Sequence, residues 1–92
     1  LKRMTVNPGE ILSLQSHEHR SEFWYVSEGV ATVECDDNVF DLKKHESTNI
    51  PLYSKHRLSN NSNDVLKVIE VQIGDLLSED DITRYEDRYE RD

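Results

Sequence analysis

SLQSHEHRSEFW, residues 13–24, places the polar side chains of Gln15, His17 and His19 at every second position. Residues at this spacing share one face of an extended strand, so the segment predicts a strand that aims an amide and two imidazoles at the same side. Glu22 follows closely, and we expect it on the inner face of the next strand. Such inward polar groups are costly to bury unless a partner satisfies them, and a divalent metal ion would do so.

Short apolar runs separated by turn signals extend along the chain on both sides of this segment. The run SEFWYVSE stops at Gly29, Asp36-Asp37-Asn38 has the composition of a hairpin turn, and VLKVIEVQI stops at Gly74. About eight short strands with turns every 8–12 residues or so are typical of a β-sandwich or a small barrel. We therefore predict an all-β fold.

The last segment has a different pattern. Ser78 followed by Asp81 has the form of a helix-capping box with Asp in place of Glu. Ile82, Tyr85 and Tyr89 then follow at helical spacing. These features predict one short helix over residues 78–89, placed after the strands.

The chain has 92 residues and a net charge of −8. We predict a single domain over residues 1–92, with a barrel over about 1–74 and a helical tail over about 75–92. The acidic balance argues against nucleic acid or an anionic membrane as a partner. No apolar run approaches the roughly 18 residues of a membrane span and no signal peptide is visible, so we expect a cytoplasmic protein. Cys35 is the single cysteine, which excludes an intrachain disulfide and a thiolate-based metal site.

The spacing of the candidate ligands follows a known signature. The first run begins and ends with a glycine, and its members are separated in turn by five, one, four and six residues: Gly9, Gln15, His17, Glu22 and Gly29. The second run has gaps of one, two and three residues and consists of Pro51, Tyr53, His56 and Asn60. Together the two runs resemble the two-motif signature of the cupin superfamily, whose members are small jelly-roll β-barrels that hold one metal ion in the barrel mouth.

Three longer segments narrow the resemblance. PGEILSLQSHEHRSEFWYVSEGVATV, IPLYSKHRLSN and GDLLSEDDITRYEDRYERD are similar, in order, to segments of the C-terminal isomerase domain of the type II enzymes that combine mannose-1-phosphate guanylyltransferase with mannose-6-phosphate isomerase. The resemblance implies a metal-dependent aldose–ketose isomerase that interconverts mannose 6-phosphate and fructose 6-phosphate. The chain departs from the family pattern where Tyr53, Ser78 and Glu90 replace glycines and where Phe23 replaces a histidine. His45 stands where a glycine begins the second motif in many cupins.

The resemblance assigns the metal ligands to Gln15, which stands in place of the first histidine, and to His17, Glu22 and His56. A neutral amide oxygen binds a metal less strongly than an imidazole, so Gln15 could instead form hydrogen bonds beside the ion. Zinc is the expected metal, with cobalt, manganese, nickel or iron as alternatives.

Catalysis requires a group that transfers a proton between two carbons and a cation that meets the phosphate or the developing enediolate oxygen. His19 is the candidate for the first role, with a position beside the ligands and a purely structural role as alternatives. Arg84 lies in the segment that resembles the family's terminal arginine motif and is the second catalytic candidate. Further cations that border the site in sequence, and so are candidates for binding the substrate, are Arg20, Lys55 and Arg57.

Two other functions remain as alternatives. A non-catalytic sugar- or metal-binding cupin module is favoured by Tyr53, which would narrow the barrel mouth, and by the negative charge of Glu90. An iron-dependent cupin oxygenase ranks lower, since oxygenases commonly carry a histidine where Gln15 stands. In each case we expect a small molecule as the partner, a phosphosugar in the leading interpretation, and we keep a homodimer open as the oligomeric state.

Overall fold

Residues 1–86 of the computed structural model are described here, and residues 87–92 lie outside the described part of the chain. Within residues 1–86 the secondary structure consists of nine β-strands and no helix. In chain order the strands are β1 (Lys2–Val6), β2 (Leu14–Ser16), β3 (Ser21–Glu28), β4 (Ala31–Cys35), β5 (Asn38–Leu42), β6 (Ser47–Ile50), β7 (His56–Ser59), β8 (Leu66–Ile73) and β9 (Thr83–Glu86). The prediction of an all-β fold is confirmed.

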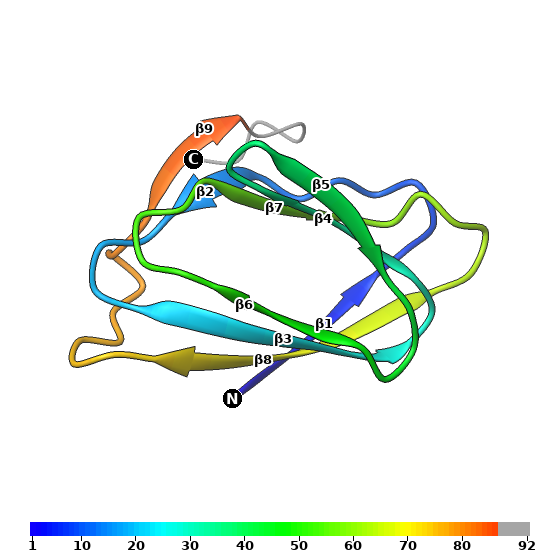
Figure 1. Cartoon of the computed structure of the whole chain (residues 1–92), viewed down its shortest axis with the longest axis horizontal. Coiled ribbons are helices and arrows are strands. Elements are labelled where there is room, and N and C mark those ends of the chain that lie inside the picture. The colour runs from blue at the N-terminus through cyan, green and yellow to red at the C-terminus, as the bar shows by residue number, and fades with distance from the viewer. Residues whose placement is uncertain (87–92) are drawn as a thin grey trace.

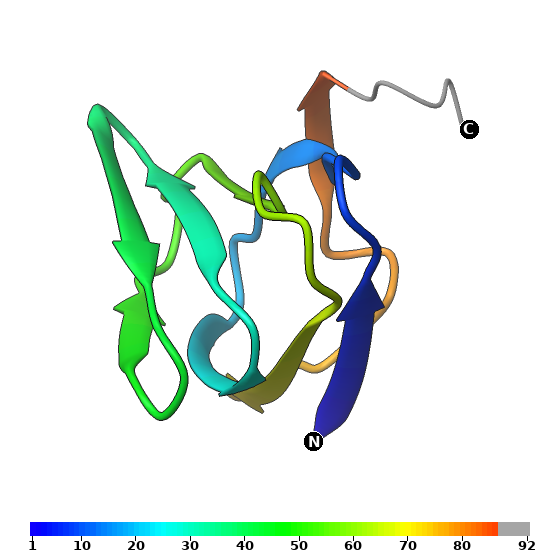
Figure 2. The same ribbon diagram turned by 90° about the vertical axis from the view of Figure 1, so that its right-hand side faces the viewer.

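The strands form two antiparallel sheets that lie one above the other (Figure 1). One sheet has the order β1-β8-β3-β6 and the other the order β5-β4-β7-β2-β9. The view turned by 90° shows the two sheets curving around a common interior (Figure 2). Strands β1 and β9 are therefore edge strands of different sheets, a point that matters for the cavity described below.

Alternating burial explains which residues fill this interior. In β3 the side chains of Glu22, Trp24 and Val26 are buried, while the residues between them are partly exposed. In β8 the buried positions are Leu66, Val68 and Glu70. Because side chains alternate across a strand, each of these strands presents two apolar residues and one glutamate to the interior. The rest of the buried apolar core comes from both sheets and comprises Val6, Ala31, Val33, Leu42, Ile50 and Leu58.

Two residues that replace family glycines have left-handed backbone conformations. The φ angle is +74° at His45 and +66° at Tyr53. L-residues adopt this region at a cost because Cβ approaches the neighbouring carbonyl, whereas glycine adopts it freely. Tyr53 is 69% exposed and does not line the cavity that reaches the candidate site, so the prediction that it narrows the barrel mouth is wrong.

The helix predicted over residues 78–89 is wrong for the part that the structure describes, and residues 87–89 lie outside that part. The Asp81 N–H donates to the Ser78 carbonyl at 3.1 Å, so the capping pattern builds a turn. The chain then continues as β9, which pairs with β2, and the hydroxyls of Ser16 and Tyr85 lie 2.9 Å apart in a hydrogen bond. Pairing with β2 thus outweighs the helical spacing of the sequence.

The pairing of β9 also places part of the predicted tail within the barrel. This strand lies beyond residue 74, where the sequence suggested that the barrel ends, and it forms one edge of the five-stranded sheet. Among residues 1–86 there is no helix that is long and apolar enough to cross a membrane.

Candidate metal centre

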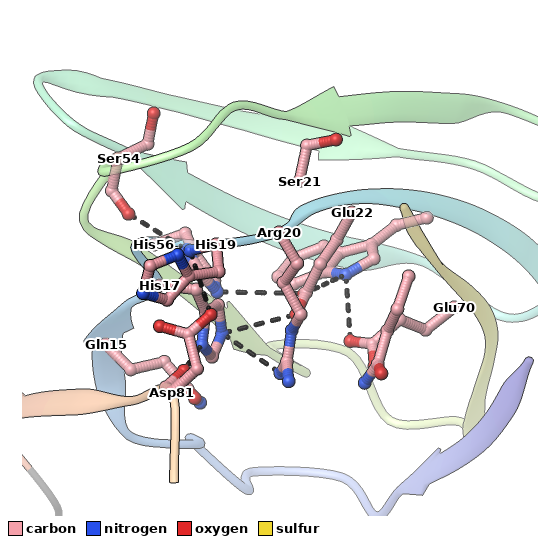
Figure 3. A network of polar contacts seen from close by, with 12 residues as sticks. Gln15, His17, His19, Arg20, Ser21, Glu22, Ser54, His56, Glu70 and Asp81 are labelled. Carbon is pink, nitrogen blue, oxygen red and sulfur yellow. Dashed lines mark hydrogen bonds and ion pairs between the residues drawn. The ribbon is translucent and has the colours of Figure 1, made fainter. Parts of the chain in front are cut away.

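Two histidines and one glutamate come together between the sheets (Figure 3). His17 follows β2, Glu22 lies on β3 and His56 begins β7. One donor atom from each lies within 4.8 Å of the others, with His17 Nε2 at 3.2 Å from Glu22 Oε2 and His56 Nε2 at 3.8 Å from Glu22 Oε1. All three residues are at most 3% exposed. Three such donors converging at a buried point form a set that could hold a divalent metal ion.

Backbone carbonyls orient both imidazole rings. His17 Nδ1 lies 2.6 Å from the Asp81 carbonyl oxygen, and His56 Nδ1 lies 3.0 Å from the Ser54 carbonyl oxygen. A carbonyl oxygen only accepts hydrogen bonds, so each Nδ1 carries the proton and donates it. Each Nε2 is then directed toward Glu22, an arrangement typical of histidines that bind metal through Nε2 while the other nitrogen is held by a hydrogen bond.

The Glu22 carboxylate is held from two further sides. Arg20 Nε donates to Glu22 Oε2 at 3.0 Å, and Arg20 Nη2 lies 3.3 Å from His17 Nε2. The Trp24 indole N–H is shared between Glu22 Oε1 at 3.0 Å and Glu70 Oε1 at 3.2 Å. Trp24 is 3% exposed and belongs to the core as predicted, but its N–H also links two buried carboxyl groups.

Burial and these contacts give the two carboxyl groups opposite pKa shifts. Burial alone would raise the pKa of Glu22, but the contacts with His17, Glu70 and His56 hold it well below its usual range. Burial, followed by the neighbouring Glu22, raises the pKa of Glu70. Of the two carboxyl groups, Glu22 therefore ionises first as the pH rises, and it is the one that faces both imidazoles.

The two histidines also differ. Burial lowers the pKa of His56, which favours the neutral imidazole that a metal ion requires. Burial also acts to lower the pKa of His17, but the contacts with Glu22 and with the Asp81 carbonyl outweigh it and raise that pKa. Because a metal ion binds the neutral imidazole, a metal ion at His17 would compete with a proton more strongly than one at His56.

A cavity of about 730 Å³ reaches this cluster. Glu22 and His56 line it together with Gln15, whose backbone lies directly opposite His56 across the β2–β7 pair. The Gln15 side-chain amide donates to Ser13 Oγ at 3.1 Å. Gln15 is thus beside the cluster, in a position compatible with either of the roles that the sequence left open for it.

His19 lies elsewhere. Strand β2 ends at Ser16 and the chain bends at residues 18–19, so the alternation of Gln15 and His17 does not continue to His19. The Asp81 carboxylate accepts hydrogen bonds from the Glu18 and His19 N–H groups at 2.8 and 2.9 Å and fixes this bend. His19 is exposed and lines a separate cavity of about 310 Å³. The prediction that it shares the inner face is wrong.

The four cations predicted to contact the substrate differ in their position relative to the main cavity. Arg20 is bound to Glu22 as described, and Lys55 lies outside the main cavity with its Nζ 4.4 Å from the centroid of the Tyr85 ring. Arg57 lines the cavity but forms ion pairs with Glu34 and Glu86, at 3.6 and 3.3 Å, and its buried Nε makes no hydrogen bond. Arg84 is exposed and lines the cavity.

Sequence reasoning missed Glu70 and Lys2, which also line the cavity. Glu70 was detectable, since a single acid interrupts the apolar alternation of Leu66 and Val68 in the most β-branched run of the chain. Lys2 carried no comparable signal, because a lysine near the start of a strand is typical of exposed surface.

The fold is a cupin fold, as the likeness to two solved structures shows. The cupin domain of Cnp3 from Schizosaccharomyces pombe superposes with a TM-score of 0.76 at 14% identity, over 79% of this chain and 50% of that chain. A conserved protein with a double-stranded β-helix domain from Klebsiella pneumoniae superposes with a TM-score of 0.80 at 18% identity, over 91% of this chain and 71% of that chain. At such low identities these likenesses establish the fold alone.

Sequence comparison then gives the family. The family model described as "Mannose-6-phosphate isomerase C-terminal" matches residues 1–87, and the chain belongs to this family. It is 54% identical to the alginate biosynthesis protein AlgA of Pseudomonas syringae pv. tomato, in an alignment of 91 residues that covers 99% of this chain and 19% of that protein. The xanthan biosynthesis protein XanB of Xanthomonas campestris is 52% identical, over 99% of this chain and 20% of that protein. The mannose-1-phosphate guanylyltransferase ManC of Salmonella typhimurium is 48% identical, over 99% of this chain and 19% of that protein. The chain thus spans about a fifth of the length of these curated relatives.

Proposed function

We propose that this chain is a metal-dependent sugar-phosphate isomerase domain that interconverts mannose 6-phosphate and fructose 6-phosphate. The observation that carries the proposal is the buried cluster of His17, Glu22 and His56 at the wall of a cavity, in a chain whose family is named for this isomerase. The cavity is large enough for a small ligand, since typical sites enclose about 300–1,000 Å³.

The donor set fits a divalent ion. Bonds of about 2.0–2.2 Å from zinc to nitrogen and oxygen leave donor atoms roughly 3–4 Å apart, close to the observed separations of 3.2 and 3.8 Å. The fixed Nδ1–H bonds leave both Nε2 atoms as donors, and Glu22 is ionised. In the proposal His17, Glu22 and His56 hold the ion, with Gln15 beside them as a fourth ligand or a hydrogen-bonding neighbour.

Aldose–ketose isomerisation moves a proton between C1 and C2 through an enediol. A bound divalent ion would polarise the carbonyl oxygen as a Lewis acid. The chain's own residues bind and orient the sugar: Trp24 and Arg20 hold the Glu22 carboxylate in place, and Arg84 presents a guanidinium to the cavity. We keep Arg84 as the candidate for contact with anionic oxygens of the substrate and set His19 aside because it lies outside this cavity.

The alternative of a non-catalytic binding module has lost one of its supports. Tyr53 was expected to obstruct the barrel mouth, but its ring is exposed away from the cavity. The other support, Glu90, lies outside the described residues. Tyr53 therefore no longer argues against catalysis, and the argument from the charge of Glu90 stays a prediction.

A coupled assay for fructose 6-phosphate formation from mannose 6-phosphate tests the proposal. The protein is first stripped of metal with a chelator and then loaded separately with zinc, cobalt or manganese. We expect turnover to be lost on stripping and restored on loading, and His56→Ala to lower kcat/KM by at least about 100-fold. Absence of turnover with every metal, in protein that binds the metal, would exclude the isomerase and leave the binding module as the better interpretation. Oxygen consumption in the iron-loaded protein would instead indicate an oxygenase.

A further inference from the structure

Four cationic side chains from residues 1–86 line the main cavity: Lys2, Arg20, Arg57 and Arg84. Two of them are neutralised locally, since Arg20 is bound to Glu22 and Arg57 forms ion pairs with Glu34 and Glu86. Within the described chain, Lys2 and Arg84 have no acidic partner within 4.0 Å. The charge available to an anionic ligand in this cavity is therefore carried by Lys2 and Arg84.

Strand register places Lys2 on the inner face of its sheet. Lys2 on β1 lies directly opposite Glu70 on β8, and Glu70 lies directly opposite Trp24 on β3. Directly opposed residues of antiparallel strands project to the same face of the sheet. Lys2 is therefore the last member of an inward row that leads to the Trp24 N–H, which holds Glu22.

Arg84 has the equivalent position in the other sheet. Arg84 on β9 lies opposite Gln15 on β2, and Gln15 lies opposite His56 on β7. Because β1 and β9 are edge strands, the two rows end at the free edges of the two sheets, and both ends line one cavity. In Figure 2 the dark-blue strand β1 and the orange strand β9 lie in the right half of the view, and the strand orders assign them to different sheets.

The spacing suits a sugar phosphate. Neighbouring strands are about 4.8 Å apart, so Arg84 lies two strand spacings, roughly 10 Å, from His56 along its row. A six-carbon chain with a terminal phosphate can bridge such a gap, with its carbonyl end at the candidate metal centre and its phosphate at the sheet edges. Glu79 and Asp80 also line the cavity, but neither forms an ion pair with Lys2 or Arg84.

We propose that Lys2 and Arg84, from the edges of opposite sheets, form the subsite that binds the phosphate of a phosphomonoester substrate. Arg84 offers a planar pair of N–H donors and Lys2 a mobile ammonium, a combination that can meet phosphate oxygens from two sides. This inference rests on the proposed function, because it takes the carbonyl end of the sugar to lie at the candidate metal centre. It replaces Arg20, Lys55 and Arg57, the cations that sequence neighbourhood alone suggested for binding the substrate.

Calorimetric titration of the whole chain with mannose 6-phosphate and with free mannose tests the subsite. The variants are Lys2→Met, Arg84→Met and the double variant, and the matched control is Lys44→Met, which removes the same charge from an exposed lysine outside both cavities. We expect about a tenfold increase in the Kd for mannose 6-phosphate in each single variant and a larger one in the double variant. Affinity for free mannose and the melting temperature should stay as in the wild type, since all three side chains are exposed.

The outcomes separate this inference from the proposed function. If the wild type isomerises mannose 6-phosphate and the double variant keeps its KM and Kd, the subsite is wrong and the isomerase stands. If the double variant loses affinity for the phosphate ester in a protein without turnover, the subsite stands and the isomerase is wrong. An equal loss in Lys44→Met would reduce the effect to net charge and overturn the subsite, as would failure of the wild type to bind mannose 6-phosphate. Competition by inorganic phosphate in the wild type but not in the double variant would support it directly.

Discussion

Replacing Tyr53 by glycine should stabilise the protein. Tyr53 has a φ angle of +66°, its ring is 69% exposed, and its N–H donates to the His17 carbonyl at 2.8 Å. The left-handed conformation costs an L-residue about 1–2 kcal/mol, while glycine adds about 0.4–1 kcal/mol of backbone entropy to the unfolded state. The difference predicts a net gain of about 0.5–1 kcal/mol. In a domain of this size that gain corresponds to a rise in Tm of about 2–8 °C.

Tyr53→Ala is the matched control, because it removes the same ring but keeps the strained Cβ. The comparison uses thermal melts of metal-free protein followed by circular dichroism, with urea titrations to check that the m-value is unchanged. Tyr53→Gly should melt above Tyr53→Ala, and Tyr53→Asn should fall between them, since asparagine tolerates this region better than alanine. A glycine variant no more stable than the alanine variant would falsify the argument from backbone strain.

Four further predictions concern the site and the bend beside it. His56→Ala should lower zinc affinity, measured by calorimetry, far more than Gln15→Ala, because an imidazole is a stronger ligand than an amide; equal losses would contradict the proposed ligand set. In the wild-type protein, metal at a hundredfold excess over its Kd should stabilise the fold by about 2.7 kcal/mol. An unchanged Tm on chelation would mean that the cluster is satisfied without an ion. Glu70→Gln should raise the Tm of metal-free protein at pH 7 and not at pH 4, because the folded-state pKa of Glu70 is raised. The contribution of Glu70 to stability is complete below its unfolded pKa of about 4.3, and it is lost as the pH rises through the folded pKa. A gain that is the same at both pH values would argue against that raised pKa. Asp81→Asn should speed hydrogen exchange at the His19 amide, because the Asp81 carboxylate accepts the hydrogen bond from that N–H. Unaltered exchange, measured by NMR, would show that the bend is held by other contacts.

The fold was predictable where alternation and turns agree. The interior positions of β3 and β8 follow directly from the alternation of apolar residues in the sequence. The segment after Gly74 was not predictable in this way, because Ser78 and Asp81 form a local pattern that suits both a helix cap and a turn. The deciding partners of this segment lie in β2 and the loop that follows it, more than 60 residues away in the sequence.

The site was predictable to the extent that motif spacing encodes it. The structure brings His17, Glu22 and His56 together, as their spacing suggested. The position of His19 was mistaken because the strand ends three residues before it, and strand ends are poorly encoded by local sequence. The role of Glu70 depends on the register between β8 and β3, a relation between distant strands that neither motif contains.

Asp81 and Tyr85 contact residues that are distant in the sequence, and this has a consequence for the order of folding. The bond from the His17 ring spans 64 residues, the bond from the His19 amide spans 62, and the hydroxyl contact between Ser16 and Tyr85 spans 69. During synthesis, His17 leaves the ribosome long before the residues that orient it, so its ring cannot acquire its final orientation until β9 has joined β2. Contacts of high sequence separation form slowly because loop closure must precede them. A nascent chain should therefore form the local β4–β5 hairpin and pair β3 with β8 before β9 joins β2, so that the candidate metal centre is complete only in a late step.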